Sequence, residues 1–148
     1  MMADNQADLL MEVALRRVSE RYAYAVDTGD GDLLAAQFTA DGAVIAPRGT
    51  FEGLAQLRGI PDMVASRYLK TFHAVLNQAV RPVEGGAVGE TYCIARHYFR
   101  DPAGRYLCYE MTIRYQDRFV RTPDGWRLSR RELVVVGTHT YEAQDAAS

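Results

Sequence analysis

The second half of the chain contains four long segments rich in β-branched and aromatic residues, and this pattern most constrains the fold. The segments cover residues 71–83, 87–100, 105–121 and 126–137. Short turn sequences with the compositions EGG, DPAG and TPDG separate them. Consecutive strands joined by such hairpin turns form an antiparallel meander. We therefore expect one long antiparallel sheet in this half of the chain.

The first half of the chain has helical periodicity instead. Apolar residues recur at helical spacing between about Asp8 and Val26, which predicts an amphipathic helix. The elements predicted after it are a short helix to Phe38 capped by Asp30 or Asp32, a strand over 43–46, and a helix over 54–68 interrupted by Gly59 and Pro61.

Helices followed by a long sheet are typical of an α+β domain with the helices packed on one sheet face. A chain of 148 residues is long enough for one such domain, and it contains no internal repeat or linker, so we expect a single domain over residues 1–148. A long sheet that curls around helices leaves a cavity between the two layers. Such a cavity is a natural site for a small molecule.

Composition excludes several classes of partner. The net charge is −2 and the arginines are spread singly, so we expect no nucleic-acid binding. No apolar run is long enough to span a membrane, and the N-terminal residues do not resemble a signal peptide. Cys93 and Cys108 are not spaced as a metal-binding pair and form no disulfide framework. We therefore expect a cytoplasmic protein without membrane contact.

His73 lies in the first long segment, within KTFHAVLNQAV. Strict period-two alternation places His73, Val75 and Asn77 on one face, and Phe72 and Val80 on the other. A face with His, Asn and small apolar residues fits a pocket wall. It fits a core histidine bonded to the backbone equally well.

His97 lies in the second long segment, within TYCIARHYF. It shares its face with three small residues, Thr91, Cys93 and Ala95. Small side chains there leave room for a ligand, or for a helix that packs on the sheet.

Several common catalytic motifs are absent from the sequence. It has no nucleophile elbow, no metal-binding His or Cys pattern, and no glycine-rich nucleotide loop. We therefore expect no metal and no cofactor. Acid–base chemistry by His, Asp and Tyr side chains remains. Asp27 is a candidate for this chemistry because it stands at an unfavourable position. The backbone carbonyls in the last turn of a helix carry partial negative charge and disfavour an acid there by roughly 0.3–1 kcal/mol.

Three stretches resemble the SnoaL-like branch of the nuclear-transport-factor-2-like superfamily. They are ERYAYAVDTGDGDLLAAQFTADGAV, HAVLNQ and DGWRLSRREL, and the resemblance spans about residues 8–137. It implies a cone-shaped α+β barrel, with three N-terminal helices packed in a curved, mainly antiparallel sheet. This scaffold hosts dehydratases, isomerases, cyclases and non-catalytic binding proteins.

Within that family the chain resembles the scytalone-dehydratase-like lyases, which work without a cofactor through an Asp–His dyad. Asp27 and His73 match the two positions of the dyad. Matching positions in individual members also imply catalytic roles for Tyr22 and His97 and a substrate contact for Arg131. The stretch AVIAPRG lacks the substrate-holding tyrosine of scytalone dehydratase, so a different substrate is expected.

Tyr22 and Asp27 do not share one face of a regular helix. A separation of five residues places their side chains about 140° apart around the helix axis. On this argument the two converge only if the helix ends irregularly near Asp27.

The sequence thus predicts a cofactor-independent lyase in which His73 abstracts a proton from a small cyclic or aromatic substrate. Elimination of water or a similar leaving group follows. Asn77, Phe72 and Tyr92 are expected to contact the substrate. The alternatives are an isomerase or aldol-type enzyme on the same scaffold, or a non-catalytic ligand-binding module. A curved open sheet leaves a large exposed face, so we also expect a homo-oligomer. The resemblance to the dehydratases implies a trimer in preference to a dimer. We expect the tail after Gly137 to be mobile or to reach a neighbouring subunit.

Overall fold

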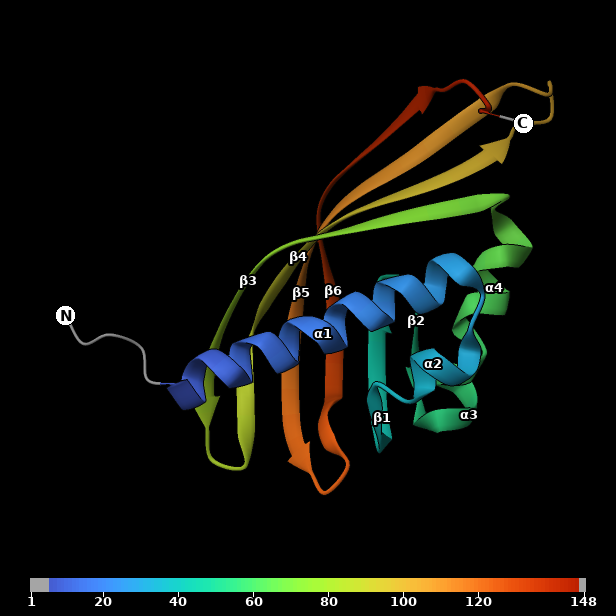
Figure 1. Ribbon diagram of the computed structural model, residues 1–148. Helices are drawn as coiled ribbons and strands as arrows, with labels where there is room; N and C mark the ends of the chain where they lie inside the picture. The colour runs from blue at the N-terminus through green and yellow to red at the C-terminus, as the bar shows by residue number, and fades with distance from the viewer. Residues whose placement is uncertain (1–5, 147–148) are drawn as a thin grey trace.

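The computed structural model describes residues 6–146. It consists of one curved sheet with helices packed against it (Figure 1). The elements in chain order are α1 (Gln6–Thr28), α2 (Gly31–Ala35), β1 (Phe38–Ala46), β2 (Gly49–Glu52), α3 (Gly53–Arg58), α4 (Ile60–Arg67), β3 (Lys70–Val83), β4 (Gly86–Arg100), β5 (Tyr106–Thr122) and β6 (Gly125–Glu142).

The sheet has six strands in the order β2-β1-β6-β5-β4-β3. Neighbouring strands are antiparallel except β1 and β6, which pair in parallel. In Figure 1, α1 crosses one face of this sheet, and the long strands bend midway so that their upper halves swing toward α4. The α+β class and the mainly antiparallel sheet are confirmed. The barrel is not closed by strand pairing, because β2 and β3 lie at opposite ends of the sheet.

The four long strands of the second half are confirmed, with small shifts at their ends. The helix predicted over 54–68 forms as two helices, α3 and α4, which separate at Gly59. Phe38 begins β1 instead of ending a helix. The predicted mobility of the tail is wrong as far as Glu142, because β6 continues to that residue and pairs with β5 over residues 107–111.

A β-bulge in β3 overturns the predicted alternation after Val75. The pairing of β3 with β4 shifts register between Val75 and Gln78. One extra residue reverses the faces that follow it. Asn77 is therefore exposed and does not share the face of His73, while Gln78 turns inward and donates to Ser19 Oγ and Thr91 Oγ1.

Helix α1 ends in a left-handed turn at Gly29, whose φ is +74°. The backbone N–H of Asp30 donates to the carbonyl of Ala25 over 2.9 Å, and that of Gly29 donates to the carbonyl of Val26. This is the Schellman arrangement, which requires a residue that tolerates positive φ at the Gly29 position. The turn keeps α1 regular through Asp27 and directs the chain into α2, which Asp30 caps by accepting from the N–H of Leu33.

The core lies between α1 and the inner face of the sheet. Leu15, Val18 and Val26 of α1 are buried there, together with inward-facing strand residues such as Phe119 and Leu128. Within residues 6–146, no helix combines the length and apolar character needed to cross a membrane.

Candidate active site

The end of α1 and the start of β3 bring Asp27 and His73 together. Asp27 Oδ1 lies 2.6 Å from His73 Nδ1, and Asp27 Oδ2 accepts from the backbone N–H of His73 over 2.9 Å. Thr71, two residues earlier on the same face of β3, donates its hydroxyl to Asp27 Oδ1 over 2.8 Å. Three donors thus fix one carboxylate, and the carboxylate fixes the imidazole.

These contacts determine the ionisation of Asp27. Burial alone would raise the pKa of its carboxyl, but the hydrogen bonds from His73 and Thr71 outweigh it and hold the pKa below its ordinary value. An ionised carboxylate accepts only, so His73 Nδ1 carries the proton that lies between them. In the neutral imidazole Nε2 is then the nitrogen without a proton, and the ring lines a cavity; a general base has this arrangement.

His97 lies on β4, and its ring is 5.7 Å from that of His73 between centroids. Ala95 pairs directly with His73 across the two strands, and its small side chain leaves space between the two rings. The Nδ1 atom of His97 donates to the carbonyl of Tyr109 over 3.0 Å. Burial of the ring lowers the pKa of His97 below its ordinary value. His97 is therefore neutral at neutral pH, with Nε2 as an acceptor.

The lowered pKa of His97 predicts a pH dependence of stability. The unfolded chain binds the His97 proton near its ordinary pKa of about 6.5, and the folded chain binds it only at lower pH. The contribution of His97 to the free energy of unfolding is therefore fully present above about pH 6.5. It is lost as the pH falls from there toward the pKa of His97 in the folded chain.

We expect His97→Gln to remove this part of the acid sensitivity. Urea unfolding of both proteins between about pH 5 and pH 8 measures it. The exposed histidine of β6 gives the control variant, His139→Gln. Parallel pH profiles for the wild type and His97→Gln would contradict the assignment.

An inner cavity of about 110 Å³ lies beside the dyad. Tyr22, His73 and His97 all line it, and the remaining walls are mainly apolar. The Tyr22 hydroxyl has no hydrogen-bond partner among residues 6–146 and is available to a ligand in the cavity. Burial raises the pKa of Tyr22 to about 12, so the hydroxyl stays protonated and can donate.

The helix need not end irregularly for Tyr22 and Asp27 to act together. Asp27 points from α1 toward β3, where it meets Thr71 and His73. Tyr22 points toward the core, where its ring packs edge-on against Phe38 and Tyr115. His73 connects the two residues, because its ring is hydrogen-bonded to Asp27 and lines the same inner cavity as Tyr22.

A wider hollow of about 350 Å³, which we call the mouth, adjoins the inner cavity. Both spaces share Phe51, Met63 and His97 among their lining residues. Tyr68 packs against His97 with the rings tilted and 4.7 Å between their centroids, and Tyr109 also lines the mouth. The full lining of the mouth is Ala46, Pro47, Arg48, Gly49, Phe51, Met63, Val64, Arg67, Tyr68, His97, Tyr109, Met111, Leu133 and Val135.

Arg131 occupies a different position from the one predicted. It is 1% exposed, and it binds Asp117 through Nε and Nη2, each over 2.8 Å. Nη2 also donates to Ser19 Oγ, and the guanidinium lies 4.6 Å from the ring centroid of Tyr22 and 4.1 Å from that of Tyr115. These contacts cover the faces of the guanidinium and use most of its N–H donors. Arg131 therefore packs behind Tyr22 and does not line the inner cavity.

The other three predicted substrate contacts do not line the inner cavity or the mouth. Phe72 is 56% exposed and lies on the outer face of the sheet, opposite His73. Tyr92 also points outward and packs against the guanidinium of Arg114. Asn77 is turned to solvent by the bulge.

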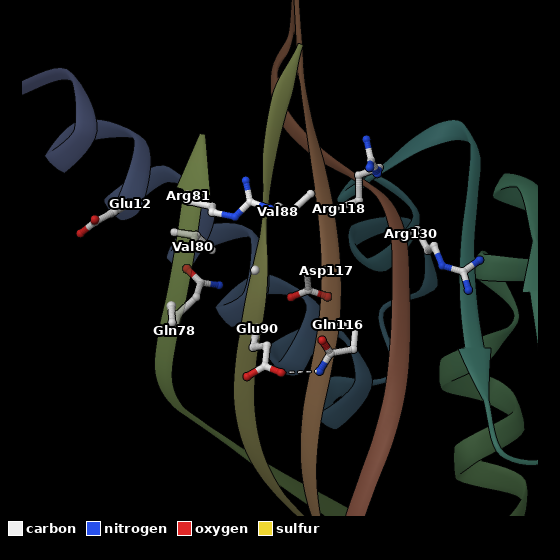
Figure 2. Close-up of a pocket in the computed structure, with 12 residues that line it drawn as sticks. Glu12, Gln78, Val80, Arg81, Val88, Glu90, Gln116, Asp117, Arg118 and Arg130 are labelled. Atoms are coloured by element: carbon white, nitrogen blue, oxygen red, sulfur yellow. Dashed lines mark hydrogen bonds between the residues drawn. The ribbon is translucent and has the colours of Figure 1, made fainter. Parts of the chain in front are cut away.

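A separate hollow of about 640 Å³ lies near the β3–β4 and β5–β6 turns (Figure 2). Figure 2 shows Arg81, Arg118 and Arg130 around it, with Glu90 bonded to Gln116. None of its lining residues belongs to the dyad or to the inner cavity. Within residues 6–146 no three His, Cys, Asp or Glu side chains are arranged to hold a metal ion.

Sequence reasoning missed Thr71 and the aromatic mouth residues. Thr71 could have been found, because period two places it on the face of His73. Tyr68 and Tyr109 could not, since their positions depend on how α4 and the bent strands meet.

Comparison with known proteins identifies the fold. Residues 7–132 match the family model of the SnoaL-like domain. A candidate scytalone dehydratase from Novosphingobium aromaticivorans is 24% identical over 93% of this chain and 91% of that one, with a TM-score of 0.78. Hexachlorocyclohexane dehydrochlorinase LinA-type3 from Novosphingobium barchaimii is 14% identical over 90% and 92%, with a TM-score of 0.79.

A protein of unknown function from Mycobacterium tuberculosis is 24% identical over 90% of this chain and 78% of that one, with a TM-score of 0.76. No curated protein matches the chain. The structural matches establish a shared fold, and the family model covers most of the sequence. The chain therefore belongs to the SnoaL-like domain family.

Proposed function

We propose that this protein is a cofactor-independent lyase that acts on a small cyclic or aromatic substrate in the inner cavity. The observation that carries the proposal is the 2.6 Å contact between Asp27 Oδ1 and His73 Nδ1, on an imidazole whose other nitrogen is free at the cavity. The candidate dehydratase and the dehydrochlorinase with the same fold support an elimination.

In the proposed step, His73 Nε2 takes a proton from the carbon next to a substrate carbonyl. The electrons of that C–H bond form the new C=C bond, and the bond from the neighbouring carbon to a hydroxyl breaks. The departing hydroxide takes a proton and leaves as water. Asp27 stabilises the imidazolium that forms on His73, and it holds the ring in the productive tautomer.

Tyr22 and His97 have different tasks in this proposal. The protonated Tyr22 hydroxyl donates to the substrate carbonyl as negative charge develops there. Neutral His97 offers only an acceptor, so it orients a substrate hydroxyl. The imidazolium of His73 is the acid that can protonate the leaving group.

We expect Tyr22→Phe to lower kcat by about 10²- to 10³-fold, because it removes one donor to the developing charge. Its thermal stability should stay close to that of the wild type, since the ring contacts with Phe38, Tyr115 and Arg131 do not need the hydroxyl. Steady-state kinetics and thermal unfolding of the two proteins measure these effects. Tyr24→Phe, at an exposed tyrosine of the same helix, is the control. An unchanged kcat would exclude Tyr22 as the electrophile.

A panel of cyclic β-hydroxyketones in deuterated buffer tests the reaction class. Absorbance of the enone product reports elimination, and NMR reports exchange of the proton next to the carbonyl. Enone formation that His73→Ala abolishes supports the lyase. Exchange without elimination identifies an isomerase or aldol-type enzyme instead, because the same base then breaks the C–H bond while the bond to the hydroxyl stays intact. Binding without either signal identifies a binding module.

A further inference from the structure

Two arginines stand at the mouth of the cavity. Arg48 lies in the turn between β1 and β2, and Arg67 is the last residue of α4. Both line the mouth, and both also line an adjoining outer hollow of about 280 Å³. Strand β2 and helix α3 lie between the two arginines in sequence, and the fold places both side chains around one opening.

These arginines differ from most others in the chain because they lack a carboxylate partner. Arg58 pairs with Asp32, Arg96 with Glu110, and Arg131 with Asp117. Within residues 6–146, Arg48 and Arg67 form no ion pair or hydrogen bond, and no Asp or Glu lines the mouth or the adjoining hollow. The opening therefore carries two uncompensated positive charges.

This local charge contrasts with the chain as a whole, whose net charge is −2. A hollow lined by charge of one sign, with apolar walls, concentrates its field and attracts ligands of the opposite sign. The walls between the arginines and the dyad are apolar or aromatic, including Phe51, Met63 and Tyr68. Guanidinium groups bind carboxylates through paired N–H donors, with favourable geometry as well as charge.

We propose that Arg48 and Arg67 bind a carboxylate of the substrate, so that this protein acts on a cyclic or aromatic carboxylic acid. The acid group lies at the mouth and the ring extends inward toward His73. The orientation rests on the proposed function, but the carboxylate site itself does not. A neutral substrate of the same shape would leave both guanidinium groups unused.

Binding measurements test this site without any turnover. The probes are benzoate and 2-naphthoate, each compared with its neutral primary amide by calorimetry at up to millimolar concentration. We expect the carboxylates to bind more tightly than the amides. The single variants Arg48→Gln and Arg67→Gln should each weaken 2-naphthoate binding roughly threefold, and the double variant about tenfold or more.

Arg81→Gln is the matched control for these variants. Arg81 is also exposed and lines a hollow, but that hollow is the separate one of Figure 2. Its replacement should leave carboxylate affinity unchanged, and added salt should weaken carboxylate binding to the wild type but not amide binding. Arg48→Lys should retain part of the affinity, because it keeps the charge but loses the paired donors.

Three results would overturn the inference. They are equal affinity for acids and amides, full carboxylate affinity in the double variant, and no carboxylate binding at millimolar concentration. The His73→Ala variant separates this inference from the proposed function. Carboxylate binding that survives in His73→Ala supports the site even if no elimination is found. Elimination from neutral substrates only would uphold the lyase and refute the carboxylate site.

Discussion

Replacing His73 by alanine is expected to lower the turnover of an elimination substrate by about 10²- to 10⁴-fold, the range that a positioned general base contributes. Asp27→Asn should produce a comparable loss. An amide at position 27 offers a donor as well as an acceptor, so it no longer holds the His73 ring in the tautomer with Nε2 free. Steady-state kinetics on the β-hydroxyketone panel measure both losses.

Two exposed residues provide controls of the same chemistry. His139→Ala removes an exposed imidazole from β6, and Asp124→Asn neutralises an exposed carboxylate in the turn between β5 and β6. Neither should change turnover. Thermal unfolding must show that the His73 and Asp27 variants are folded at the assay temperature. A folded His73→Ala protein with full activity would refute the dyad mechanism.

The largest loss of stability is expected from Asp117→Ala. This variant leaves Arg131 buried without its carboxylate, and breaking a buried ion pair from one side costs about 3–5 kcal/mol of unfolding free energy. For a chain of this size, that corresponds to a fall in Tm of roughly 6–20 °C. Thr91 also loses the carboxylate that accepts its hydroxyl hydrogen bond, which adds to the effect. Chemical denaturation and thermal unfolding measure the loss.

The double variant Asp117→Leu with Arg131→Met should recover part of the stability, because apolar side chains of similar volume replace the buried pair. The exposed pair of Arg114 and Glu90 provides the control, since water screens it and Glu90→Gln should change stability far less. If Asp117→Ala stayed as stable as the wild type but lost ligand affinity, Arg131 would be a substrate contact after all.

The long strands could be predicted because their turns are local. The three turns that join them contain Gly85, Gly104 and Gly125, each with positive φ, where side-chain-bearing residues are strained. Helix α1 could be predicted equally well, because its apolar residues recur at regular helical spacing. The match of Asp27 and His73 to a known dyad came from family resemblance, and the structure places the two within hydrogen-bond distance.

Register irregularities explain what could not be predicted. Extending the register of the β5–β6 turn from Phe119 and Leu128 would pair Asp117 with Arg130. A shift between Arg118 and Phe119 pairs it with Arg131 instead, so one inserted residue decides which arginine is buried. The bulge in β3 removes Asn77 from the site in the same way. The predicted homo-oligomer stays a prediction.

The contacts of α1 with β3 also protect the sheet from unwanted strand addition. As the last strand in the order, β3 presents backbone donors and acceptors that a second chain could pair with. Asp27 occupies the N–H of His73, and Arg16 occupies the carbonyls of Val75 and Leu76. At these three positions the side chains of α1 occupy backbone groups that an added strand would need, so the carboxylate that orients the base also protects part of this edge from strand addition.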